Sequence, residues 1–359
     1  MVYSTIVGID VHTGTNEVFA LNRATGEARP ATLPGEVDRV VEWVQAQGFE
    51  GPVVCVYESG PLGYGLARAL HAAGFGCVVV ATSKMPGRTG RRKNDRIDAR
   101  RLARLYMAGE LAEVWIPGEE AESLRSLSVL RGEAAKDLAR AKQRVGSLLL
   151  FVGCRWEKGR KRWTKAFYSW AGGLALPFAD RFVLDEKLAE VRHLAERLDG
   201  IEKELDRQAA ARPGLTEAMA RLMCVHGIGR VTAFALVCLA GDFRRFASGA
   251  AFASYLGLMP SEDSTGDSVR TGRITKAGNR YVRRLLMEAV NCYSRPFRRQ
   301  RPEDLDPAVP LPVRVKAAAC SERLRRRRAA LVARKKSGGK IKCALARELA
   351  EWVYYIAVM

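Results

Sequence analysis

The chain has 359 residues, of which 48% are apolar, and its formal net charge is +20 with a pI near 9.9. This composition excludes a disordered chain, and the length suffices for two or three domains. The charge is too positive for an ordinary metabolic enzyme and indicates a polyanionic partner, most simply DNA or RNA. We expect no membrane partner and no zinc site, because no apolar run reaches about 20 residues and the eight cysteines form no C-x-x-C pair.

The first hundred residues alternate between strand-like and helix-like patterns. Apolar strand runs cover residues 5–9, 17–21, 53–57 and 77–81, and helical patterns cover about 36–47 and 62–73. Two strands before the first helix, followed by strand, helix and strand, predict a mixed sheet rather than a parallel repeat. The order is that of a ribonuclease-H-like domain, in which acidic metal ligands lie at strand ends.

Four carboxylates occupy such positions. Asp10 follows the apolar run 6–9, Glu58 follows 53–57, and Asp95 and Asp98 lie three residues apart at the start of a predicted helix. Each element alone is typical of a loop, a helix cap or a solvated helix face. Taken together, the four side chains predict an oxygen-ligand site for one or two Mg²⁺ ions, because a buried carboxylate needs a cationic partner.

Residues 116–212 have a different character and are predicted to be helical. Long helical patterns cover residues 119–150 and about 184–208. Leucine, isoleucine and valine recur at spacings of three or four residues through the second of these, with charged residues between them. This pattern predicts a coiled-coil seam or a long helical hairpin, and it leaves both internal packing and self-association open.

Residues 213–359 read as a helical domain that contacts phosphates. The run 225–229 resembles a helix-hairpin-helix turn, in which Gly227 and Gly229 would expose backbone amides to a phosphate. A loop at 257–267 then leads to Arg270, Arg273 and Lys276, and a further helix carries three more arginines at 280, 283 and 284. This cationic stretch is compatible both with phosphate contact and with an ordinary surface loop.

The end of the chain is strongly basic. Residues 313–342 contain twelve Lys or Arg and a single acid, Glu322. Such a run is either a solvated arm or a track for a nucleic-acid backbone. Residues 341–356 return to an amphipathic pattern, which predicts a helix that packs back on this domain. The predicted domains are therefore 1–115, 116–212 and 213–359, and the fold class is α/β plus all-α.

Taken in order, these motifs resemble the bridge-RNA-guided insertion-sequence transposases, which are related to the Piv-type DNA invertases. The resemblance covers nearly the whole chain. The matching segments are 8–10, 57–60 and 93–99 toward the N-terminus, and 226–229, 241–243, 255–260 and 274–279 toward the C-terminus. It implies a RuvC-like N-terminal domain of the ribonuclease H fold, central coiled-coil helices and a C-terminal transposase domain.

The resemblance also implies an activity and a set of partners. Asp10, Glu58, Asp95 and Asp98 would bind Mg²⁺, and a C-terminal serine would attack DNA to form a covalent phosphoserine intermediate before strand exchange. A structured non-coding RNA would pair with donor and target DNA. Dimers would assemble into a tetramer, with tetrad and serine from different subunits, in the bacterial cytoplasm and at the nucleoid.

The position of the serine departs from the family pattern. The serine usually precedes the loop glycine directly, and here that position is Thr265, with Ser264 one residue earlier. Counting back from Lys276 favours Ser264, whose primary hydroxyl is also the less hindered nucleophile. Thr265 is the alternative and Ser268 a third candidate.

Two other functions are compatible with the sequence. A Holliday-junction-type nuclease would use the same tetrad to hydrolyse DNA with water and would form no covalent adduct. A non-enzymatic, basic nucleic-acid-binding protein would carry structural acids and show no dependence on divalent metal.

Overall fold

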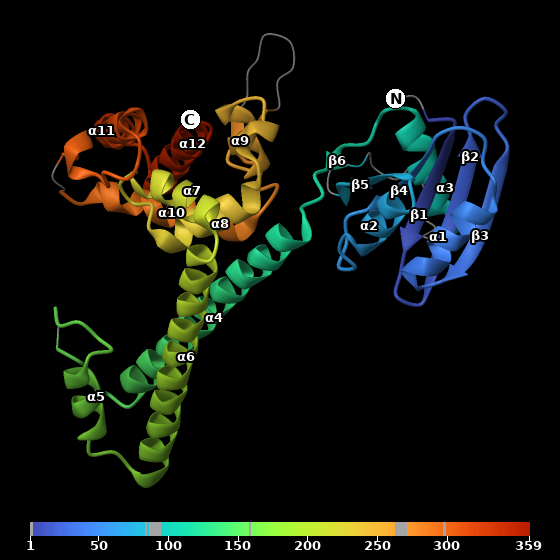
Figure 1. Cartoon of the computed structure of the whole chain (residues 1–359). Coiled ribbons are helices and arrows are strands. Elements are labelled where there is room, and N and C mark those ends of the chain that lie inside the picture. The colour runs from blue at the N-terminus through green and yellow to red at the C-terminus, as the bar shows by residue number, and fades with distance from the viewer. Residues whose placement is uncertain (1–2, 83–84, 86–94, 158, 263–270, 297–298) are drawn as a thin grey trace. The chain divides into compact units, whose positions relative to one another are not determined.

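The computed structural model describes the whole chain apart from residues 1–2, 83–84, 86–94, 158, 263–270 and 297–298. The chain divides into two compact units, Met1–Pro117 and Gly118–Met359 (Figure 1). The long central helices belong to the second unit. A separate central domain, as the sequence predicts at 116–212, therefore stays a prediction.

The first unit is built on a mixed six-stranded sheet. Its strands are β1 (Thr5–Val11), β2 (Thr15–Asn22), β3 (Ala28–Pro34), β4 (Val53–Glu58), β5 (Gly76–Val80) and β6 (Glu113–Val114). They are ordered β3-β2-β1-β4-β5-β6. The pairs β1–β4 and β4–β5 are parallel, and the pairs β3–β2, β2–β1 and β5–β6 are antiparallel. The sequence-based prediction of a mixed sheet is confirmed.

Helices cover both faces of this sheet. On one face, α1 (Val37–Ala46) and α2 (Gly65–Ala72) pack on the odd-numbered side chains of β1 and β4, among them Val7 and Ile9. On the other face, α3 (Asp95–Met107) packs on even-numbered side chains such as Ile6 and Val54. Both faces of the central strands are therefore buried, which explains their continuous apolar runs.

The sequence analysis missed β3. Its side chains alternate between intermediate and exposed positions, and it carries Pro30 and Pro34. Proline has no amide hydrogen to donate to a neighbouring strand. It is tolerated in β3 because this strand lies at the edge of the sheet and pairs on one side only. Because β3 buries no side chain completely, it leaves no apolar run in the sequence.

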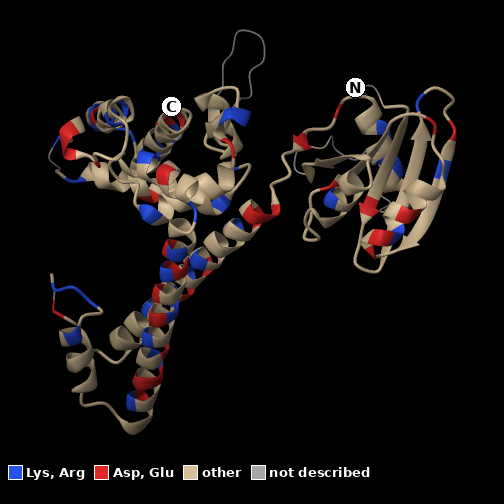
Figure 2. Cartoon of the chain, viewed as in Figure 1, with Lys and Arg blue, Asp and Glu red and all other residues tan. Residues whose placement is uncertain are grey.

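Two helices of the second unit, α4 (Glu119–Phe151) and α6 (Phe178–Ala210), form an antiparallel hairpin that is capped by α5 (Lys165–Gly172) (Figure 1). Leu138 and Val145 of α4 pack with Leu184, Leu188 and Val191 of α6. The seam predicted from the leucine spacing is thus an internal one along this stretch. Acidic and basic residues recur along both helices (Figure 2), and self-association stays a prediction.

The remaining elements surround the largest apolar core of the described chain. They are α7 (Pro213–Met223), α8 (Arg230–Ala240), η2 (Phe243–Arg245), α9 (Gly249–Tyr255), β7 (Pro260–Glu262), β8 (Thr271–Ile274), α10 (Arg280–Ala289), η3 (Val290–Ser294), η4 (Pro302–Asp304), α11 (Leu311–Ala333) and α12 (Gly338–Ala357). Leu345, Leu349 and Val353 of α12 are buried in this core, which confirms that the last helix packs back on the domain. Among the described residues, no helix is long and apolar enough to cross a membrane.

The basic stretch is folded rather than a free arm. Most of it lies in α11, whose Ala317, Cys320 and Leu324 are buried against the core. The arginines occupy the remaining faces of the same helix, so α11 presents them on a fixed surface. The β7–β8 hairpin is a further difference from the sequence analysis, which predicted a loop over this region.

Candidate functional site

The parallel pairing of β1 and β4 brings Asp10 and Glu58 to the same end of the sheet. Strands β1 and β4 are parallel neighbours, and Ile9 pairs with Tyr57, so Asp10 and Glu58 occupy the next position of each strand. Side chains alternate along a strand, which places both carboxylates on the face that also carries Ile6 and is covered by α3. His12 Nε2 lies 3.4 Å from Oδ2 of Asp10.

Helix α3 brings Asp98 to the same face. It packs directly on β1 at Gly8, where an added Cβ would lie 2.1 Å from the carbonyl oxygen of Ala99. Asp98, the residue before Ala99, is only 8% exposed. Asp95 is the first residue of α3 and lies one turn before Asp98 on the same helical stripe, but its side chain is outside the described part of the structure.

The donor chemistry of these residues fits a hard cation. Carboxylate oxygens are the ligands that Mg²⁺ prefers, and a divalent ion would offset the cost of gathering several acids on one buried face. Within the described side chains, no group of three or more His, Cys, Asp or Glu is close enough to hold a metal ion. Asp10, Glu58 and Asp98 share one face of the sheet but do not form such a group, and the tetrad with Asp95 stays a prediction.

The sequence analysis missed a fifth carboxylate at this end of the sheet. Glu17 of β2 is the cross-strand partner of Asp10, and directly opposed residues share one face of a sheet. The hydroxyl of Thr32 on β3 donates to both carboxylate oxygens of Glu17, at 2.9 and 3.0 Å. Only the register of the β1–β2 hairpin identifies this neighbour, and the amino-acid sequence does not specify that register clearly.

In the second unit, the predicted helix-hairpin-helix turn joins α7 to α8. Gly227 has a φ of 93°, and an added Cβ would lie 2.5 Å from the carbonyl oxygen of Ala289. Gly229 is different: it is the N-cap of α8, an added Cβ would meet nothing within 4 Å, and no side chain caps this helix end. Both predicted phosphate-binding glycines are exposed, and of the two only Gly229 caps the N-terminus of α8, beside the positive end of a helix dipole.

The turn is braced from two sides. The amide of His226 donates to Oγ of Ser321 on α11 at 3.1 Å, and the hydroxyl of Tyr293 donates to the carbonyl of His226 at 2.9 Å. The imidazole of His226 also lies against the ring of Tyr293, and burial lowers the pKa of this histidine. These contacts fix the backbone that leads to Gly229.

The predicted hydroxyl nucleophiles cannot be placed. Ser264, Thr265 and Ser268, together with the predicted phosphate contact Arg270, lie outside the described residues. The other two predicted contacts are described: Arg273 in β8 and Lys276 after it are both exposed, as a phosphate contact requires.

Arg283 is buried, whereas the sequence analysis predicted it to be part of an exposed, phosphate-binding cluster. It is 9% exposed and donates to the carbonyl oxygens of Leu256 and Ala277, at 2.9 and 3.0 Å. Burial and the neighbouring Arg280 lower its pKa. Since Leu256 precedes the β7–β8 hairpin and Ala277 follows it, Arg283 ties together the two chain segments at the base of this hairpin.

The sequence matches known protein families in two places. Residues 7–153 match a family described as "Transposase", of the DEDD type of IS110, and residues 219–303 match the "Transposase IS116/IS110/IS902 family". A putative transposase y4qE of Sinorhizobium fredii is 34% identical over 98% of this chain and 88% of its own length. The transposase for insertion sequence element IS1533 of Leptospira borgpetersenii is 28% identical over 68% of this chain and 71% of its own length.

Proposed function

The chain belongs to the IS116/IS110/IS902 family of transposases, and on this premise we propose that it cuts and joins DNA by a metal-dependent reaction with a serine nucleophile. The observation that carries the proposal is that Asp10 and Glu58 lie at the ends of neighbouring strands, and Asp98 lies on the helix that covers the same face of the sheet. Acids on neighbouring strand ends and on the helix that covers them are costly for the fold. A role in metal binding accounts for them.

In this proposal Asp10, Glu58, Asp95 and Asp98 hold one or two Mg²⁺ ions. When bound, Mg²⁺ would neutralise the charge that develops on the phosphoryl oxygens of the DNA. The sheet and α3 hold the ligands in fixed positions, because α3 cannot move closer to β1 than the Gly8–Ala99 contact allows. His12 lies 3.4 Å from Asp10 and would orient its carboxylate.

The covalent step we propose uses the hydroxyl of Ser264, with Thr265 as the alternative. The hydroxyl oxygen forms a bond to phosphorus, the bond from phosphorus to one DNA oxygen breaks, and the hydroxyl proton ends on the departing DNA oxygen or on water. A serine hydroxyl is a weak nucleophile and needs activation by a base or a metal ion. A DNA hydroxyl later reverses the step on a new strand and releases the protein.

Guide RNA and assembly are further parts of this proposal. The net charge of +20 and the exposed Arg273 and Lys276 support binding to nucleic acid without distinguishing RNA from DNA. We infer a structured RNA that selects donor and target DNA, and a homo-oligomer of two to four chains, from the resemblance of the motifs to RNA-guided family members.

A trapping assay tests the proposed chemistry. Purified protein, Mg²⁺, RNA transcribed from the flanking region and labelled element-end DNA are mixed, and denaturing gels are searched for a protein–DNA adduct. We expect an adduct with the wild type, none with Asp10→Asn, and none with one of Ser264→Ala and Thr265→Ala. The Asp10→Asn variant should still bind DNA. Metal-dependent cleavage without an adduct would contradict the serine mechanism and favour a hydrolytic nuclease.

A further inference from the structure

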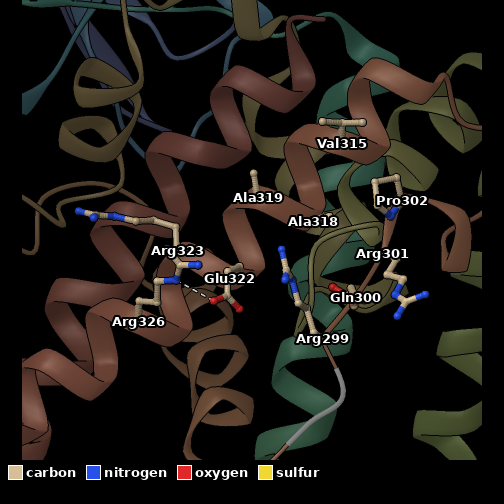
Figure 3. Close-up of a pocket in the computed structure, with 10 residues that line it drawn as sticks. All are labelled: Arg299, Gln300, Arg301, Pro302, Val315, Ala318, Ala319, Glu322, Arg323 and Arg326. Carbon is tan, nitrogen blue, oxygen red and sulfur yellow. Dashed lines mark hydrogen bonds and ion pairs between the residues drawn. The ribbon is translucent and has the colours of Figure 1, made fainter.

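A cleft rich in arginine lies in the second unit, beside the basic helix α11. It is a cavity of about 740 Å³ between the segment 299–302 and helix α11 (Figure 3). Arg299 and Arg301 line it from the segment, and Arg323 and Arg326 line it from α11. Figure 3 shows Arg299 on one wall and Glu322 with its partner Arg326 on the other.

The positive charge of this cleft exceeds its negative charge. Four arginines of α11 share only two carboxylates: Arg325 and Arg326 pair with Glu322, while Arg323 and Arg327 pair with Glu348. Across the gap, the guanidinium groups of Arg299 and Arg301 form no ion pair with the described residues, and the nearby carboxylate of Asp304 accepts from the backbone amide of Arg301. The hydrogen bonds from Arg325 and Arg326 lower the pKa of Glu322 to about 2, so Glu322 stays ionised and orients these two guanidinium groups.

The walls of the cleft are fixed from behind by one buried residue. Ser321 is 1% exposed, and its hydroxyl lies 2.9 Å from Oε1 of Gln300, to which it can donate. The same hydroxyl oxygen accepts the amide hydrogen of His226 in the turn that leads to Gly229. The segment 299–302, α11 and the turn before α8 are therefore held together, and the arginines on them keep a defined spacing.

The chemistry of the lining indicates what the cleft binds. Guanidinium groups form paired hydrogen bonds with phosphate oxygens. The residues that line the cavity include no aromatic side chain on which a base could stack, and the apolar part of the wall consists of Val315, two alanines and a proline. The cleft is thus suited to phosphates rather than to bases.

We propose that this arginine cleft binds the phosphodiester backbone of a nucleic acid without reading its sequence. The proposal rests on the proposed function only in that the protein must bind nucleic acid at all. DNA and RNA present the same phosphate chemistry, and the experiment separates them. The cleft adds a contact surface to the exposed Arg273, Lys276 and Gly229.

Salt-dependent binding tests the proposal on the full-length protein. Fluorescence anisotropy with a labelled DNA duplex and, separately, a labelled structured RNA is measured over a range of KCl concentrations without Mg²⁺. The cleft variant is Arg299→Gln/Arg301→Gln. The matched control is Arg23→Gln/Arg39→Gln, which removes the same charge from two exposed arginines of the first unit.

For at least one polymer, we expect the cleft variant to bind at least tenfold more weakly at low salt. Its slope of log K against log [KCl] should be smaller by about 1.4 for single strands to 1.8 for duplex, because each lost phosphate contact removes about 0.7 to 0.9. The control should bind within twofold of the wild type. The polymer that is affected identifies the source of the phosphates.

Cross-linking locates the contact directly. Val315 lines the cleft and is 49% exposed, whereas Val332 lies on the same helix outside the cleft and is 47% exposed. A photoreactive benzoylphenylalanine is placed at each position in turn. Cross-links to the same polymer should form from position 315 at several times the yield from position 332.

Each remaining outcome has one meaning. Equal losses in the cleft and control variants would overturn the proposal, since only net charge would then matter, and so would cleft-variant binding that equals the wild type for both polymers. Equal cross-linking from positions 315 and 332 would overturn it as well. A wild type that binds neither polymer would refute the proposed function itself, which the Asp10→Asn trapping result tests separately.

Discussion

Gly8 controls how closely α3 approaches the sheet, and its replacement tests the placement of Asp98. In Gly8→Ala the new Cβ would lie 2.1 Å from the carbonyl oxygen of Ala99 and 2.8 Å from the amide nitrogen of Ala103. Both are backbone atoms, so no side-chain rotation relieves the clash. Since contacts shorter than 3.0 Å essentially never occur for a Cβ, α3 must recede by roughly 1 Å.

Two effects follow from this shift. Overpacking of this kind costs about 1–3 kcal/mol of unfolding free energy, because Leu102 and Ala103 lose contact with Ile6 and Val54. Asp98 moves with the helix, and a displacement of about 1 Å at reacting groups can slow a reaction about 100-fold. We therefore expect Gly8→Ala to fold with reduced stability and to lose most of its DNA strand-transfer activity.

Urea unfolding and a strand-transfer assay, run at a temperature at which the variant is folded, measure the two effects separately. Gly14→Ala is the matched control, because an added Cβ at this position meets nothing within 4 Å. The control should stay within about 0.5 kcal/mol of the wild type and keep full activity. Wild-type stability and activity in Gly8→Ala would refute the close packing of α3 on β1 and the position of Asp98 that depends on it.

Three further substitutions give distinct expectations. Gly227→Ala should destabilise the second unit by several kcal/mol, because Gly227 has a positive φ and no room for a Cβ. Gly229→Ala should cost only about 1 kcal/mol, because alanine has room there but is a poorer N-cap than glycine; equal losses in the two variants would contradict this. Arg283→Met leaves the carbonyls of Leu256 and Ala277 without their donor and should cost about 2–5 kcal/mol in urea unfolding; a cost below about 0.5 kcal/mol would show that the guanidinium is not buried there. Burial raises the pKa of Cys77 to about 12, so the unfolded chain releases this proton from about pH 8.5 upward while the folded chain keeps it. Stability should thus fall by up to about 1.4 kcal/mol per pH unit above that point, and Cys77→Ala should remove this part of the decline; parallel curves for variant and wild type would exclude it.

The sequence predicts the parts of the fold that depend on buried, periodic side chains. Strands β1 and β4 are evident because both of their faces are apolar, and their parallel pairing then brings Asp10 and Glu58 together. Strand β3 is not evident, since an exposed edge strand has no burial pattern to leave in the sequence.

The candidate site is less predictable than the fold, because charge alone does not specify environment. Arg273 and Arg283 look alike in the sequence, but one is exposed on a strand and the other is buried against two carbonyls. Glu17 becomes a neighbour of Asp10 only through the register of a hairpin. Both differences arise from tertiary packing, and a single sequence gives no direct measure of it.

The base of the β7–β8 hairpin shows how such packing bears on the proposed chemistry. Gly257 has a φ of 68° and backs onto Ala277, while Gly278 has a φ of 78° and backs onto Tyr255; an added Cβ at either glycine would lie 2.0 Å from the facing carbonyl oxygen. The two chain segments thus interlock at backbone distance, and Arg283 bonds to both. The proposed nucleophile Ser264 lies in the chain between these two segments, which cannot move apart without losing these contacts. Fixed ends of this kind limit the entropy lost in positioning a nucleophile. In the proposed mechanism the glycines and the buried arginine would fix the base of the hairpin, and a hydroxyl residue would supply the chemistry.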